Sequence, residues 1–91
     1  MRYRKKPVDI EAITFSELVA LSNLRVIPDD LGWFYYNGHR IRKLNERLFM
    51  IDTLEGSMRM TSKDMLITGV TGEIYPCKVH IFQETYDIVN Q

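Results

Sequence analysis

Most of the information about this fold lies in residues 52–86, which read DTLEGSMRMTSKDMLITGVTGEIYPCKVHIFQETY. Two glycine-centred turns separate short apolar runs here, one at Glu55-Gly56 and one at residues 69–73. Glycine favours tight turns because it adopts positive φ without steric cost. We therefore expect two hairpins in this stretch, followed by a closing helix.

The strands on either side of these turns differ in their apolar pattern. Residues 48–51 form a continuous apolar run, which predicts a central strand covered on both faces. Met58 and Met60 alternate with polar residues, which predicts a half-buried strand. Pro76 has no backbone N–H to donate, so we expect its strand to end there or to lie at a sheet edge.

The closing helix is predicted by the spacing of apolar residues after Val79. The residues that share one helical face are Ile81, Phe82, Thr85, Tyr86 and Val89. We expect this face to cap an open end or face of the sheet.

Upstream, residues 33–44 read WFYYNGHRIRKL. Asn-Gly between two β-prone runs is the strongest short-range signal for a hairpin, usually with a type I′ turn. This register places Phe34, Tyr36, His39 and Ile41 on one face, and Trp33, Tyr35, Arg40 and Arg42 on the other.

The second face of this hairpin, with the adjacent Lys43, is a candidate binding site. Aromatic rings and guanidinium groups hold planar or nucleotide ligands by stacking. The alternative is ordinary cross-strand pairing on a solvated face.

The N-terminus is basic, with Arg2, Arg4, Lys5 and Lys6, and it precedes an alternating segment at residues 8–13 that predicts a strand. Its basic residues suit a phosphate-binding or partner-binding patch. They also suit a solvated terminal strand whose charges discourage edge pairing. A short helix should follow, with Ser16 as its N-cap and its end near Asn23.

These elements predict an α+β fold made of one domain, residues 1–91. It would contain a small, mostly antiparallel bent sheet or partial barrel, one helix in the N-terminal half and a short C-terminal helix.

Composition narrows the function classes. Twelve basic and twelve acidic side chains give a formal net charge of zero. This argues against non-specific nucleic-acid binding, which needs a basic excess, and it removes a barrier to a homodimer. No apolar run approaches the roughly 20 residues that span a bilayer, and no signal peptide is expected at the N-terminus. Cys77 is the single cysteine, which fits a reducing cytoplasm.

Catalytic chemistry is poorly represented in the sequence. Cys77 precedes Lys78 and His80, so a thiol nucleophile with a neighbouring base is one interpretation. The alternative is that Cys77 is a small buried residue at the end of a strand. His39 and His80 are far apart in the sequence, and no metal site or cofactor is expected. We expect the chain not to be an enzyme.

Two parts of the chain resemble a widespread family of small phage and prophage proteins. The first is YRKKPV at residues 3–8, followed by Glu11-Ala12. The second comprises TLEG at residues 53–56, GVTGEIYPCK at 69–78 and IFQETY at 81–86. The chain departs from the family pattern at 62–64, which reads SKD where the family has Pro-Gly-Asp, and at Val79, where the family often has Pro. Residues 15–50 carry no resemblance.

This resemblance implies a phage or prophage origin and assigns no catalytic residues. Small phage proteins made in the host cytoplasm often bind host machinery, including antiviral defence systems, as anti-CRISPR proteins do. We therefore expect a non-enzymatic accessory protein that binds a host protein. The alternative is a small-ligand or nucleotide-binding module. For either function, the candidate binding residues are Arg2, Arg4, Lys5, Trp33, Tyr35, Arg40, Arg42 and Lys43.

Overall fold

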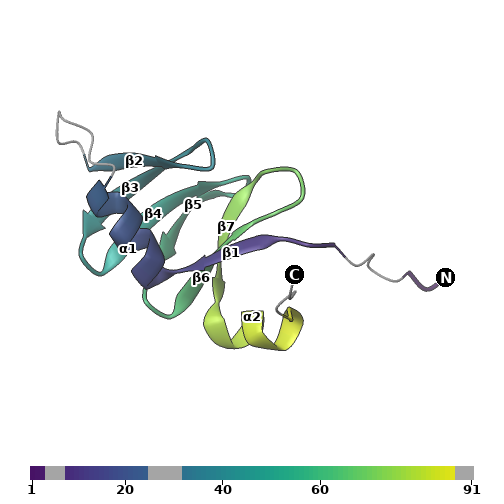
Figure 1. Cartoon of the computed structure of the whole chain (residues 1–91). Coiled ribbons are helices and arrows are strands. Elements are labelled where there is room, and N and C mark those ends of the chain that lie inside the picture. Colours follow the sequence, from purple (N-terminus) through teal and green to yellow (C-terminus); the bar gives the residue numbers. More distant parts are fainter. Residues whose placement is uncertain (4–7, 25–31, 88–91) are drawn as a thin grey trace.

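The computed structural model describes residues 1–3, 8–24 and 32–87 of the chain (Figure 1). The elements in chain order are β1 (Glu11–Thr14), α1 (Phe15–Leu24), β2 (Trp33–Tyr36), β3 (His39–Asn45), β4 (Leu48–Thr53), β5 (Gly56–Met60), β6 (Asp64–Thr68), β7 (Ile74–Lys78) and α2 (Val79–Thr85).

The strands form two antiparallel sheets. One has the order β1-β6-β7 and the other the order β2-β3-β4-β5. The two sheets do not close into a barrel. The sequence predicted one bent sheet or partial barrel, whereas the strands divide between two separate sheets. The α+β class, with mostly antiparallel sheet, is confirmed.

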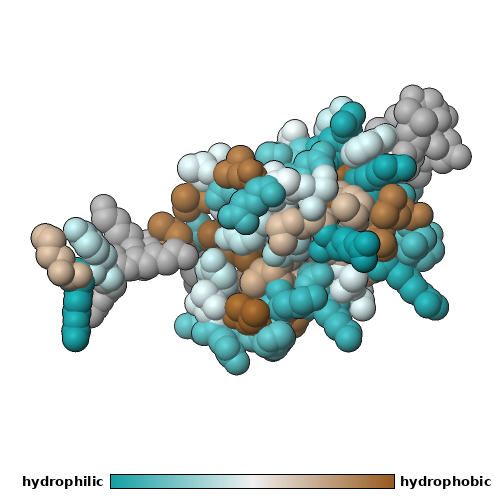
Figure 2. Space-filling view, turned by 180° about the vertical axis from the view of Figure 1, so that it is seen from behind, coloured by the Kyte–Doolittle hydropathy of each residue, from teal (hydrophilic) through white to brown (hydrophobic). Residues whose placement is uncertain are grey.

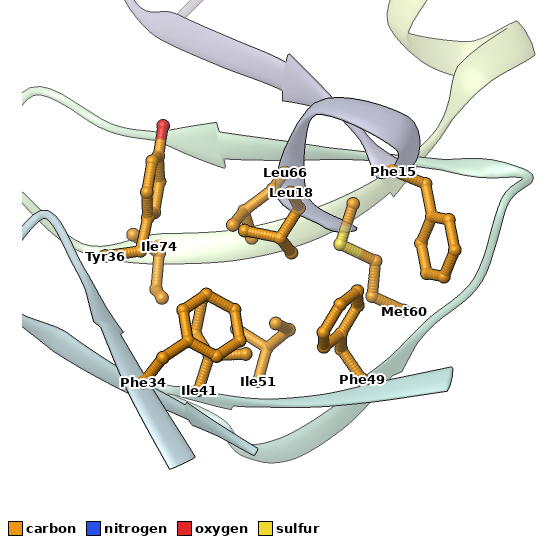
Figure 3. Packing of buried hydrophobic residues seen from close by; sticks show 10 residues of the cluster. All are labelled: Phe15, Leu18, Phe34, Tyr36, Ile41, Phe49, Ile51, Met60, Leu66 and Ile74. Atoms are coloured by element: carbon orange, nitrogen blue, oxygen red, sulfur yellow. The ribbon is translucent and has the colours of Figure 1, made fainter. Parts of the chain in front are cut away.

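The core lies between the two sheets, with α1 beside it (Figure 3). The side chains of this core cluster come from α1 and from β2 to β7, and they are Phe15, Leu18, Phe34, Tyr36, Ile41, Phe49, Ile51, Met60, Leu66 and Ile74. Phe49 is central because its ring contacts both Phe15 and Phe34, at centroid distances of 5.2 and 5.7 Å. One core therefore joins both sheets and α1.

Helix α1 begins with a capping box. The Thr14 Oγ1 atom accepts a hydrogen bond from the Glu17 backbone N–H at 3.1 Å, and the Glu17 carboxylate accepts one from the Thr14 N–H at 3.0 Å. These bonds satisfy two amides at the start of the helix. The expectation that Ser16 is the N-cap was wrong, because the chain enters the helix directly from β1 and Thr14 occupies the position three residues before Glu17.

The β2–β3 hairpin has the predicted register, with Phe34 opposite Ile41 and Tyr36 opposite His39. Asn37 and Gly38 both have positive φ, at 49° and 80°, as a type I′ turn requires. The sequence therefore predicted both the turn and the two faces of this hairpin.

Other strands differ from their expected form. A strand was expected at residues 8–13, but β1 begins only at Glu11. Val8 therefore precedes the strand, and its side chain is exposed. β4 is central in its sheet, but only Phe49 and Ile51 are buried, because its other face is turned away from the core. Met58, expected to be half-buried, is exposed because β5 lies at the sheet edge.

The edge position of the strand with Pro76 and the helix after it were both expected, but the burial of that helix differs from the expectation. β7, which contains Pro76, lies at the edge of its sheet, and α2 follows it directly. However, α2 has no buried residue, and Ile81 is exposed. Phe82 and Tyr86 are half-buried and their rings lie 5.1 Å apart. The helix therefore lies against the fold without closing the core, and Val89 lies outside the described residues.

Asp64 fixes the turn between β5 and β6. Its carboxylate is buried, accepts a hydrogen bond from the Thr61 N–H at 2.9 Å and pairs with the Lys78 ammonium group at 3.2 Å. The Val79 N–H donates to the Lys63 carbonyl at 2.9 Å. Asp64 therefore joins the turn to the end of β7.

Candidate functional site

Strand alternation gives the four-stranded sheet an inner face in the core and an outer face. On the outer face, a single row crosses all four strands, because Trp33 lies opposite Arg42, Arg42 opposite Met50, and Met50 opposite Arg59. Beside this row, Tyr35 lies opposite Arg40. We call these six residues the aromatic–arginine surface.

The arginines of this surface are organised around the one tryptophan. The guanidinium carbon of Arg40 lies 4.0 Å from the centroid of the Trp33 ring, and that of Arg42 lies 5.7 Å from it. Such cation–π contacts hold a guanidinium group flat on the ring and leave its N–H edges available for hydrogen bonds. Trp33 therefore orients two positive charges on the outer face.

The positive charge of this surface is not neutralised internally. Arg40, Arg42 and Arg59 are exposed, and none of them pairs with a carboxylate in the part of the chain that the structure describes. The acidic residue in the neighbouring part of this face is Asp52, whose carboxylate accepts a hydrogen bond from Ser57 at 2.9 Å. The surface thus offers three guanidinium groups to an anionic ligand.

Four of the residues expected from the sequence come together here: Trp33, Tyr35, Arg40 and Arg42. Lys43 does not join them, since its ammonium group lies near α1, 3.2 Å from the Asn23 side-chain oxygen and 3.1 Å from the Glu46 carboxylate. There it stabilises the end of a helix that has no basic residue in its own last turn.

Of the basic N-terminal residues, the structure describes Arg2. Arg2 is exposed on an N-terminal segment that projects from the body (Figure 1). Arg4 and Lys5 lie outside the described residues. The structure therefore does not place Arg2 on the aromatic–arginine surface.

Sequence reasoning missed Met50 and Arg59. Arg59 alternates with Met58 and Met60, so its outward direction was readable from the pattern. Its position in the same row as Trp33 depends on the registers of three successive hairpins, and the sequence specified only the first of these registers.

The exposed residues on one side of the molecule are mostly polar. The side of the molecule seen in Figure 2 carries hydrophilic residues interspersed with small, separate hydrophobic patches.

The environment of Cys77 does not activate its thiol. Burial, and secondly the negative charge of Asp64, raise the pKa of Cys77 above its ordinary value of 9.0. A nucleophilic cysteine needs the opposite shift, because the thiolate is the reactive form. The thiol contacts the Lys78 carbonyl oxygen at 3.6 Å, which agrees with a residue at a strand end.

The described residues contain no cluster of metal ligands and no helix that could span a membrane. In residues 1–3, 8–24 and 32–87, no three His, Cys, Asp or Glu side chains lie together as a metal site would need. Within the same ranges, neither helix has the length and apolar character needed to cross a membrane.

Comparisons with protein-family models, with curated proteins and with solved structures give no match to this chain.

Proposed function

We propose that this chain is a non-enzymatic binding protein, whose aromatic–arginine surface contacts an acidic surface of a partner protein. The observation that supports this function is the pair of arginines held against Trp33, with a third, Arg59, in the same cross-strand row. These guanidinium groups have no carboxylate partner in the described part of the chain.

The residue types support a protein partner. Tryptophan, tyrosine and arginine are the residues that most often dominate the binding energy of protein interfaces, and methionine is enriched there. All six residues of the surface belong to these four types, and none is lysine. Their place on a sheet, where each strand is fixed by its neighbours, holds them in one geometry before binding.

The family resemblance sets the biological context of this proposal. A small phage-encoded protein acts in the cytoplasm of the host, so its partner would be a host protein. Inhibition of an antiviral defence system is the activity we propose for the complex, with the arginines covering an acidic site on the host component.

The test is a pull-down from bacterial lysate with matched variants. The unchanged chain should retain one stoichiometric protein, and the Arg42→Glu/Arg59→Glu variant should lose it, because the two substitutions reverse the charge of two of the three arginines of the surface. Arg47→Glu is the control, since Arg47 is an exposed arginine in the β3–β4 turn. Equal retention by all three chains would reject this surface as the binding site.

A second candidate function is nucleotide binding by the same surface. It is favoured by the position of Arg40 on Trp33, because guanidinium edges bind phosphate oxygens and the aromatic rings offer stacking to a base. A thermal shift with mono- and cyclic nucleotides tests it. A shift that Trp33→Ala abolishes would support it, whereas no shift at millimolar nucleotide would exclude it.

A further inference from the structure

A groove of about 870 Å³ lies on the side of the three-stranded sheet where residues 8–12 meet the β6–β7 turn and α2. This volume lies within the range of about 300–1,000 Å³ typical of ligand pockets. Its apolar side chains include Val70, which is exposed, and the half-buried pair Phe82 and Tyr86.

The charge of the groove is of one sign. Asp9, Glu11 and Asp87 line it, and no lysine, arginine or histidine does so among the described residues. Glu11 is held at the groove by the Asn37 side chain, whose amide donates to it at 3.3 Å and to Thr68 at 2.9 Å. No partner holds Asp9 or Asp87 within the described ranges. The groove therefore suits a basic segment that also carries apolar side chains.

The chain itself supplies a segment of this composition. Residues 1–6 read MRYRKK, with four basic residues among six. In the structure the first three residues lie away from the body, and the Tyr3 side chain is 89% exposed (Figure 1). A tyrosine and a methionine in open solvent next to a basic cluster have the character of a binding segment that lacks its partner surface.

We propose that two copies of this chain form a symmetric dimer, in which the N-terminal segment of each copy binds in the groove of the other. Arg2 and its basic neighbours would face Asp9 and Asp87 of the second copy, and Tyr3 would pack against Val70 and Phe82. This assembly goes beyond the proposed function, since its groove lies at the three-stranded sheet. The aromatic–arginine surface, on the four-stranded sheet, stays uncovered.

The geometry suits a two-fold arrangement. Val8 to Ala12 line the groove, so the segment begins at the edge of the groove of its own copy. A two-fold axis beside this edge brings each segment next to the groove of the second copy, as a self-complementary interface requires. The zero net charge of the chain adds no long-range repulsion between copies.

Light scattering over a concentration series tests the proposal. The unchanged chain should reach twice the mass of one chain. Arg2→Glu/Arg4→Glu and Asp9→Lys/Asp87→Lys should each raise the dimer dissociation constant by at least about tenfold, because attraction between the copies becomes repulsion. The four substitutions combined in one chain should restore part of the affinity, because the reversed charges again match. Circular dichroism establishes that each variant folds.

A cross-link identifies the contact itself. Two chains are mixed, one with Tyr3→Cys and one with Val70→Cys, both carrying Cys77→Ser, so that any disulfide between unlike chains joins the segment to the groove. Lys63→Cys, on the β5–β6 turn, replaces Val70→Cys as the control. Rapid linkage with Val70→Cys and slow linkage with Lys63→Cys would support the exchange. A monomer at every concentration, or a dimer unaffected by both charge variants, would overturn the proposal and leave the pull-down result unaffected.

Discussion

The guanidinium carbon of Arg40 lies 4.0 Å from the centroid of the Trp33 ring, whereas that of Arg42 lies 5.7 Å from it. We therefore expect Arg40→Gln to lower the free energy of unfolding by about 0.5–1 kcal/mol, the value of an exposed cation–π contact. Trp33 is the only tryptophan. Its fluorescence should therefore become more sensitive to acrylamide quenching as the ring face is uncovered. Arg42→Gln is the control and should change quenching less; the reverse order would contradict the stacking of Arg40 on Trp33.

Helix α1 should depend on Thr14 and not on Ser16, because the Thr14 side chain satisfies the Glu17 N–H. Thr14→Ala should cost about 1 kcal/mol of stability, as loss of an N-cap does. Ser16→Ala should change it by less than about 0.5 kcal/mol, since Ser16 is an exposed position in the first turn. Urea denaturation of the two variants makes the comparison. A larger loss for Ser16→Ala would show that the capping box is misplaced.

Asp64 should be the most sensitive polar residue of the β5–β6 turn. Asp64→Ala removes the acceptor of the Thr61 N–H in a buried position, which costs about 1–3 kcal/mol. Lys78→Met removes the other half of the ion pair, but the Lys78 side chain is 54% exposed and solvent screens the pair. We expect thermal denaturation to place the melting temperature of Asp64→Ala clearly below that of Lys78→Met. Equal losses would mean that the ion pair, and not the hydrogen bond, stabilises the turn.

Stability should decline in alkaline solution through Tyr75. Burial first, and then its hydrogen bond with Tyr86, raise the pKa of Tyr75 from 10.0 to about 12. The folded state thus keeps a proton that the unfolded state releases. The stabilisation is complete below pH 10 and is lost as the pH rises towards 12. The pKa of Tyr36 is raised as well, mainly by burial, and acts in the same direction.

Absorbance titration of the tyrosinate band measures this effect, together with urea midpoints across the same pH range. Tyr86→Phe removes one hydrogen-bonding partner and should lower the pKa of Tyr75, so the alkaline loss of stability should become smaller. An unchanged titration curve in this variant would show that Tyr86 does not hold the phenol of Tyr75.

Cys77 should react slowly with alkylating reagents at neutral pH, because its pKa is raised and little thiolate is present. The rate of iodoacetamide modification should rise with pH to a midpoint above 9.0. Asp64→Asn removes the negative charge that acts on the thiol and should shift this midpoint downwards. Cys77→Ala should leave partner binding intact. Loss of binding in that variant, with the fold preserved, would assign Cys77 a functional role.

The parts of the fold that the sequence predicted are those set by local chemistry. Asn37-Gly38 specified a two-residue turn, and this turn determined the register of β2 with β3 residue by residue. Pro76 predicted an edge strand in the same way, since it lacks a backbone donor.

What the sequence did not predict depends on contacts between distant segments. The pairing of β1 with β6 joins Glu11 to Thr68, and no local pattern specifies that partner. The row from Trp33 to Arg59 likewise requires three consecutive registers. Met58 and Ile81 show a further limit of sequence-based prediction. The apolar pattern predicts that both side chains are buried, but burial also requires another element to cover them, and both are exposed.

The strands of the four-stranded sheet divide their residues between two tasks. Phe34, Ile41, Ile51 and Met60 point into the core (Figure 3). Their immediate neighbours in the sequence form the row on the other side. Substitutions on the outer side leave the core side chains unchanged, so this fold can acquire a new recognition specificity one strand at a time at a small cost in stability. A protein under pressure to follow a changing partner gains from such independence, and the same property makes this sheet a scaffold for engineered binding.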